Sequence, residues 1–239
     1  MNNLFEEWQN RHFSNGNNYF IRDGIVNQRI WDSQSTKICF FLKEAYQKDV
    51  PVWDLTNWLC NENGGDGAVV KMWRTVAEFT YGLLNTNEST IPSYYEAKSL
   101  TQSDRSKLLQ NISVVNVKKS NGESRSEWGD LVKYAIADAD LLRREIELIS
   151  PNVIVCGNTG SLLRVVYGAG VDEKGNVLHD GMIDKESCEF MSSHGYLWFD
   201  DKLIIDFYHP ANQFPKMMNF YTLCCIYQKA LKEKEIKES

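Results

Sequence analysis

The chain has 239 residues, of which 43% are hydrophobic, and this suits one α/β domain. Its net charge of −6 argues against a protein held to nucleic acid mainly by bulk electrostatics, although it does not exclude a local basic face. No apolar run approaches the length of a membrane-spanning helix, and the amino terminus lacks a signal-peptide pattern. We therefore expect a cytoplasmic protein without a membrane segment.

The cysteines lie in apparent core segments, without a C-x-x-C spacing or a nearby histidine pair. Free cysteine behaves as a small buried hydrophobe, so we expect reduced structural thiols and neither a structural metal nor an iron-sulfur cluster. The six residues are Cys39, Cys60, Cys156, Cys188, Cys224 and Cys225.

In the first 110 residues, one core strand is expected among several helices. That strand, Lys37–Leu42, is short, apolar and aromatic, as is typical of strands covered on both faces. Apolar spacing and helix-boundary signals predict the helices. These are expected over residues 2–12, 28–34, 54–61, 68–84 and 93–110.

Further along the chain, three more strands are expected and one long helix. The helix, Glu127–Ile149, has apolar residues at three- and four-residue spacing. The segment Gly157–Gly160 lacks the spacing of a phosphate-binding loop, so a tight strand-to-helix turn is favoured over an anion cradle. The strands are Ile112–Val117, Asn152–Cys156 and Leu203–Phe207, with a helix to residue 167, a hairpin over 188–199 and a terminal helix over 215–234.

Alternation of strands and helices predicts a three-layer α/β/α sandwich with a central, mainly parallel sheet of about four strands. We expect residues 1–239 to form a single domain. Residues 1–36 would be an amino-terminal helical segment, and residues 54–110 a helical insertion packed on the domain. The insertion is a candidate contact for a protein partner or for reshaping a binding face.

Two predicted strands are followed by side chains that can take part in acid–base chemistry. Glu44 follows the first strand and His209 the last, about 165 residues later. Open α/β sheets bind ligands at the carboxyl ends of their strands, so a carboxylate and an imidazole are expected near one crevice.

Three segments, in order, carry a resemblance to a known family. Leu42–Tyr46 is similar to a G-Q-D-P-Y motif at the end of a first strand, Asn116 matches an asparagine at the end of a middle strand, and His209–Ala211 matches a His-Pro-Ser motif at the end of the last strand. The chain thus resembles a divergent bacterial member of the uracil-DNA glycosylase superfamily, over roughly residues 37–216. The first motif can also be laid on a G-E-A-P-G pattern, which leaves Ala45 at the non-acidic position.

The resemblance implies a fold and a set of roles for these residues. The fold would be the uracil-DNA glycosylase-like sandwich. Glu44 and His209 would be catalytic, with Glu44 positioning water and His209 donating a hydrogen bond to the leaving base. Asn116 would pair with the edge of the flipped base, and Tyr46 would wall its pocket.

The remaining candidates would contact substrate or DNA. Lys43 either contacts a phosphate or extends into solvent, and Lys118 lies beside the pocket. The segment after the histidine would enter DNA, with Phe214 as the wedge. Its members are Pro210, Asn212, Gln213 and Phe214.

Each central residue also has a structural interpretation: Glu44 as a helix or turn cap, Asn116 as a turn residue, and His209 as a core histidine at a bend. The expected function is that of a DNA glycosylase-like hydrolase, which cleaves the N-glycosidic bond of uracil or another modified base in single- or double-stranded DNA without metal or cofactor. The alternative is a catalytically inactive protein of the same fold that binds a nucleobase, a nucleotide or nucleic acid.

Overall fold

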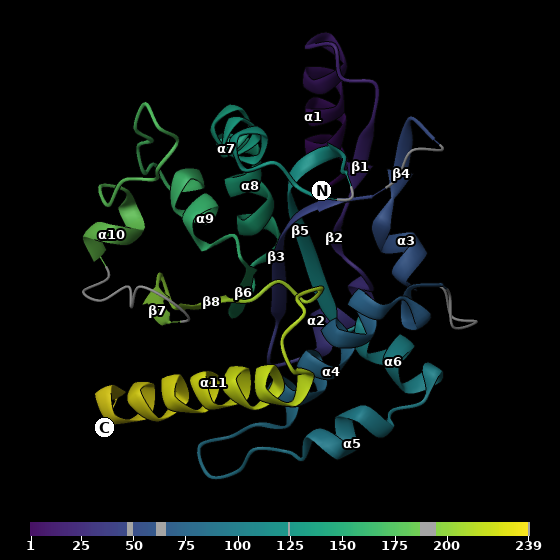
Figure 1. Cartoon of the computed structure of the whole chain (residues 1–239), viewed down its shortest axis with the longest axis vertical. Coiled ribbons are helices and arrows are strands. Elements are labelled where there is room, and N and C mark those ends of the chain that lie inside the picture. Colours follow the sequence, from purple (N-terminus) through teal and green to yellow (C-terminus); the bar gives the residue numbers. More distant parts are fainter. Residues whose placement is uncertain (47–49, 61–65, 124, 187–194, 239) are drawn as a thin grey trace.

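The computed structural model describes residues 1–46, 50–60, 66–123, 125–186 and 195–238. Its centre is a six-stranded mixed sheet in the order β2-β5-β3-β6-β8-β7 (Figure 1). The four inner strands are parallel, and the two edge strands run antiparallel to their neighbours. The strands are β2 (Gly24–Ile25), β3 (Ile38–Ala45), β5 (Ile112–Asn121), β6 (Val153–Gly157), β7 (Tyr196–Phe199) and β8 (Lys202–Phe207).

Helices occupy most of the remaining chain. In the described residues, no helix is both long and apolar enough to span a membrane. The helices are α1 (Asn2–Ser14), α2 (Gln28–Ser33), α3 (Leu55–Cys60), α4 (Lys71–Asn85), α5 (Tyr94–Ser99), α6 (Gln102–Leu109), α7 (Trp128–Ala137), α8 (Ala139–Ile149), α9 (Gly160–Val166), α10 (Met182–Glu186) and α11 (Lys216–Glu238), with a 3-10 turn η1 (Asp66–Val69).

Alternate side chains of the parallel strands enter two separate hydrophobic clusters. On β3, Cys39 and Phe41 join a cluster with residues of α1, α7, α8 and α9. Phe40 and Leu42 join a second cluster, with residues of α3, α4, α6 and α11. Side chains alternate between the faces of a strand, so helices bury both faces of the sheet.

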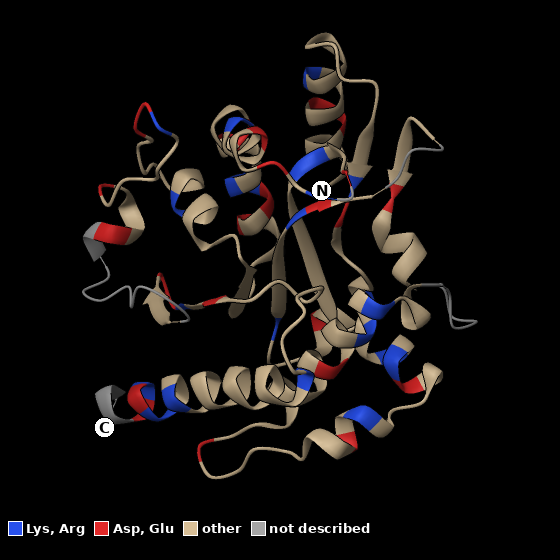
Figure 2. Ribbon diagram, viewed as in Figure 1, with Lys and Arg blue, Asp and Glu red and all other residues tan. Residues whose placement is uncertain are grey.

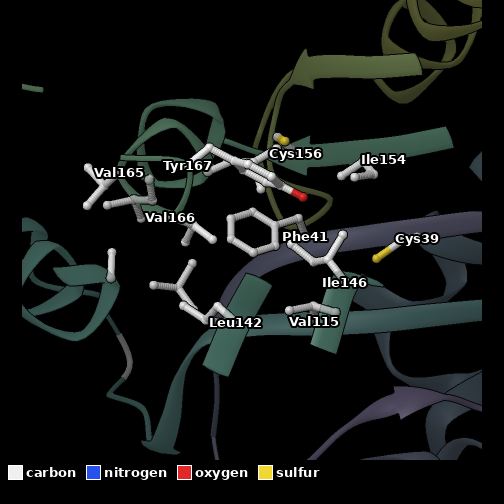
Figure 3. Close-up of a cluster of buried hydrophobic side chains, with 14 of the residues drawn as sticks. Cys39, Phe41, Val115, Leu142, Ile146, Ile154, Cys156, Val165, Val166 and Tyr167 are labelled. Atoms are coloured by element: carbon white, nitrogen blue, oxygen red, sulfur yellow. The ribbon is translucent and has the colours of Figure 1, made fainter. Parts of the chain in front are cut away.

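The first of these clusters shows why the inner strands are almost continuously apolar. Phe41 lies at its centre beside Ile146 of α8 and Tyr167 after α9 (Figure 3). The strands of the central sheet carry their charged residues mainly near the strand ends (Figure 2). Polar chemistry on this sheet is therefore concentrated where the strands stop.

Four of the strands are those expected from the sequence, but the sheet is larger than expected. Both edge strands, β2 and β7, pair antiparallel and widen it to six strands. The hairpin expected over residues 188–199 falls partly outside the described residues, and the observed hairpin is β7 with β8. Residues 1–36, expected to be helical, also contain β1 (Phe20–Arg22), which pairs with β4 (Val52–Asp54) in a separate two-stranded parallel sheet.

Two of the inner strands are longer than predicted. The strand β3 continues to Ala45, and β5 continues to Asn121 instead of ending at Val117. The extensions pair with each other, with Glu44 opposite Lys118 and a bulge before Ala45. Charged side chains of these extensions have partners of opposite charge. Strand pairing therefore continues where a polar loop was expected.

The long helix predicted over residues 127–149 is two helices, α7 and α8, which meet at Asp138. The carboxylate of Asp138 lies 2.7 Å from Nε2 of the buried His12 on α1. This contact holds Asp138 outside helical geometry, with ψ near 13°. The helix predicted over residues 93–110 is likewise divided, because Thr101 caps a new helix.

Candidate functional site

The strand order places β3 between β5 and β6 at the centre of the sheet. The chain reaches β5 on one side of β3 and β6 on the other, so the connections change direction here. In open α/β sheets, the crevice at such a point, outside the carboxyl ends of the strands, is where ligands bind. Lys43 and Glu44 of β3, Gly157 of β6 and His209 after β8 all lie at this edge.

His209 packs over the end of β6. A Cβ atom added to Gly157 would lie 2.7 Å from Leu42, 3.4 Å from the His209 ring and 3.4 Å from Pro210. Glycine therefore creates the space in which the segment after β8 reaches β3. Sequence reasoning did not single out Gly157 for this role, although its place directly after an apolar strand was a usable signal.

The protonation state of His209 follows from its surroundings. Burial, and to a smaller extent the nearby positive charge of Lys43, lower the pKa of the imidazole to about 4. The backbone N–H of Ala211 donates to Nδ1 at 3.2 Å. A neutral imidazole that accepts at Nδ1 carries its proton on Nε2, so His209 is a neutral hydrogen-bond donor at pH 7.

Glu44 lies on the β5 side of the strand end. Its carboxylate is 3.4 Å from Nζ of Lys118, which also donates to Asp130 of α7 at 2.7 Å. Burial opposes the charge of Lys118, but the bond to Asp130 and the charges of Glu44 and Asp130 raise its pKa overall. The Glu44 side chain is 6% exposed, and a Cβ on Gly122 would lie 2.6 Å from it. Glu44 is thus a largely buried carboxylate beside a lysine whose protonated form is stabilised.

Asn116 lies within β5, opposite Leu42, and not at the end of a strand as predicted. Its backbone N–H and its Nδ2 both donate to Asp23, at 2.8 and 3.0 Å. Asp23 also binds Lys119, whose Nζ lies 2.6 Å from Glu145. The amide of Asn116 is therefore oriented by a buried ionic cluster.

The lysine of that cluster, Lys119, adds no charge to the surface. Its side chain is fully buried. Burial opposes its charge, yet Asp23 and Glu145 raise its pKa overall. Burial raises the pKa of Glu145 well above its usual range.

The segment after His209 folds on itself. Asn212 donates to the carbonyl of His209 at 2.9 Å and accepts from the N–H of Phe214 at 2.9 Å. Both ends of its amide thus shape the loop, which is a structural role beside the predicted DNA contact. The Phe214 ring lies 4.8 Å from that of Tyr208 and is 55% exposed, and Gln213 is also exposed.

Lys43, Glu44 and His209 thus share one edge of the sheet, whereas Asn116 lies within β5, and the predicted site residues make separate contacts. Glu44 contacts Lys118, Asn116 contacts Asp23, and His209 is influenced by Lys43. Within the described part of the chain, no hydrogen bond or ion pair joins Glu44 to His209. Tyr46, which ends the first described range, is 67% exposed.

The turn Gly157–Gly160 is the tight strand-to-helix turn that was favoured. Thr159 donates its hydroxyl to the carbonyl of Phe41 at 2.6 Å. A Cβ on Gly160 would lie 2.5 Å from the carboxyl group of Asp206. The carboxyl group of Asp206 therefore lies against the start of α9, which favours the turn over an anion cradle.

Cysteines and acidic groups give no metal centre in the described ranges, where no cluster of three or more potential ligand side chains occurs. Cys39, Cys156 and Cys224 are buried thiols, and burial raises the pKa of each of them. Cys60 is half-buried and Cys225 is exposed. Cys188 lies outside the described residues.

Sequence reasoning missed Asp23 and Asp130, the acidic partners of Asn116 and Lys118. Asp23 directly precedes the two-residue strand β2, which has too few residues to show a pattern. Asp130 lies in the first turn of α7, where a carboxylate is favoured by the helix dipole, so it gave no separate signal.

Comparisons with protein-family models, with curated proteins and with solved structures found no match to this chain.

Proposed function

We propose that this chain is a DNA glycosylase-like hydrolase with a uracil-DNA glycosylase-like, three-layer fold. It would cleave the N-glycosidic bond of uracil or another modified base that has been flipped out of DNA. Three sequence motifs and the order of the parallel strands support the proposal. No metal or redox cofactor enters the proposed reaction.

The observation that carries the proposal is the state of His209. Departure of a base leaves negative charge on a carbonyl oxygen, and a preorganised donor in a dry site stabilises such charge strongly. His209 is neutral, and its Nε2 carries the proton. Lys43 adds positive charge near the same ring, so both groups favour a developing anion.

Glu44 would serve the opposite charge. An N-glycosidic cleavage builds positive charge on the sugar, which a carboxylate can offset while it orients the attacking water. Lys118 holds Glu44 at one end of β3, and Asp130 holds Lys118. Asp23 fixes the amide of Asn116, which would recognise the base edge.

A glycosylase assay tests this proposal. Single- and double-stranded oligonucleotides with uracil, hypoxanthine, xanthine or a hypermodified base should yield an abasic product from at least one. Glu44→Gln and His209→Ala should each lower turnover about 100-fold or more, with little change in DNA affinity. Matched controls are Glu173→Gln and His179→Ala, because both residues are exposed on the segment before α10 and belong to no predicted site. Equal losses of turnover and affinity would contradict the assigned roles.

A second candidate function is favoured by the packing of Glu44. Its carboxylate is paired with Lys118 and almost inaccessible, which suits a protein that keeps the pocket and binds a base without cleaving it. No abasic product from any substrate, together with measurable binding of a nucleobase or nucleotide, would select this function.

A further inference from the structure

A group of basic side chains surrounds one buried carboxylate, Glu78, on the helical insertion. The group consists of Lys71, Arg74, Lys98, Arg105 and Lys216, and it is called the basic cluster below. Its members come from α4, α5, α6 and the first residue of α11. Helix α4 packs against each of the other three helices, so residues far apart in sequence meet here.

The cluster holds more positive than negative charge. Glu78 is 8% exposed, and burial raises its pKa although the charges of Lys216, Arg105, Arg74 and Lys98 all lower it. Burial lowers the pKa of Lys216, and Arg74 and Lys71 lower it further. The positive charges of the basic cluster therefore repel one another around a single carboxylate.

Two nearby carboxylates accept hydrogen bonds at helix starts and, among the described residues, form no ion pair with the basic cluster. Glu96 accepts from the N–H of Ser93 at 3.2 Å, and Asp104 accepts from the N–H of Thr101 at 3.0 Å. Arg105 donates to the carbonyl oxygens of Ala68 and Leu100, which carry no net charge. Within the described ranges, no ion pair within 4.0 Å joins a member of the cluster to a carboxylate.

The cluster is also accessible, and one of its members follows the strand-end histidine in the chain. Lys71, Arg74 and Lys98 are exposed, and Arg105 and Lys216 are half-buried. Figure 2 shows basic segments of α4, α5, α6 and the start of α11 in one region below the sheet. Lys216 follows His209 by seven residues, and exposed Phe214 and Met217 flank it in the chain.

We propose that the basic cluster binds the phosphate backbone of DNA, so that the helical insertion is a docking surface beside the strand-end site. This deepens the proposed function and rests on it for the identity of the nucleic acid. The chain is acidic overall, so non-specific attraction is weak and a local surface has to supply the contact. Exposed apolar side chains beside Lys216 would cover the sugar and base faces next to the bound phosphates.

The test measures the binding of a fluorescent, undamaged 20-base-pair duplex as a function of salt concentration. The variant is Arg74→Gln/Lys98→Gln/Lys216→Gln. Each lost phosphate contact reduces the slope of log affinity against log salt by about 0.9, so the slope should fall by about 2–3. Affinity at low salt should fall roughly 10-fold or more.

A matched control is Lys133→Gln/Lys174→Gln/Lys229→Gln, which makes the same change of charge elsewhere. Its residues lie on α7, on the segment between α9 and α10, and on α11 about 20 Å along the helix from Lys216. This control should bind DNA with the wild-type slope. Thermal unfolding of both triple variants near the wild-type midpoint shows that the fold is retained.

The outcomes separate this inference from the proposed function. Wild-type affinity and slope in the cluster variant would overturn the docking surface, even if excision is observed, and would leave an acidic protein partner as the occupant. Loss of slope only in the cluster variant supports the surface, even if no base is excised. Excision is scored separately on short single-stranded substrates at low salt.

Discussion

At the scale of single residues, His209 makes stability depend on pH. Its folded pKa is about 4, below the ordinary value near 6.5. Above pH 6.5 the imidazole is neutral in both states, so its contribution is fully present. As the pH falls from 6.5 towards 4, the unfolded chain binds the proton more readily, and stability is lost.

We therefore predict that His209→Gln will show a smaller loss of unfolding free energy than the wild type between pH 7.5 and 4.5. The difference should be about 1–2 kcal/mol, because the shift is sizeable but the ring retains some contact with solvent. Urea unfolding at several pH values measures it. Lys43→Met should give an intermediate curve, since one of the two causes is removed, and parallel curves for all three proteins would refute the assignment.

At the scale of elements, two contacts attach α1 to the region where α7 meets α8. His12 and Asp138 are both 3% exposed and lie 2.7 Å apart, whereas the pair of Arg11 with Asp140 is partly exposed at 2.8 Å. A buried carboxylate that loses its partner costs far more than an exposed pair of the same geometry.

His12→Leu should therefore destabilise the protein by about 1–3 kcal/mol, while Arg11→Gln should cost less than about 1 kcal/mol. Hydrogen exchange should quicken along α1 only in the first variant. Urea unfolding and exchange mass spectrometry check both statements. A larger effect at Arg11 would show that the exposed pair, and not the buried one, fixes α1 on the sheet.

The elements also show which parts of the fold can be predicted from sequence patterns. Four inner strands were predictable because burial on both faces requires short apolar runs, as in Lys37–Leu42. The division of residues 127–149 was not, because the apolar spacing continues through Asp138 and only the distant His12 interrupts it. The extension of β5 was missed for a similar reason, since Lys118 and Lys119 resemble a loop until their carboxylate partners are known.

At the scale of the whole molecule, the candidate site depends on contacts between segments that sequence cannot pair. The motifs predicted that residues at strand ends would meet at one edge of the sheet; Glu44 and His209 lie at that edge, whereas Asn116 lies within β5. They could not predict that Asp23 would hold Asn116, or that Lys118 would pair with Glu44. Those partners lie in short or polar segments whose position is fixed only by the complete sheet.

Gly157 allows a test of how these segments pack together, because β3, β6 and the segment after β8 meet at the position that a side chain would occupy. Gly157→Ala should displace Leu42 or the His209 ring, since the added Cβ would lie 2.7 Å from the first and 3.4 Å from the second. We expect a loss of about 1–3 kcal/mol in urea unfolding and an upward shift of the His209 pKa in an NMR titration, as the ring becomes more solvated. Gly129→Ala on α7 is the matched control, because the atom nearest to its Cβ would be a carboxylate oxygen of Glu127, at 3.2 Å, and alanine favours a helix. An unchanged His209 titration in a destabilised Gly157→Ala protein would mean that the ring is buried by other contacts.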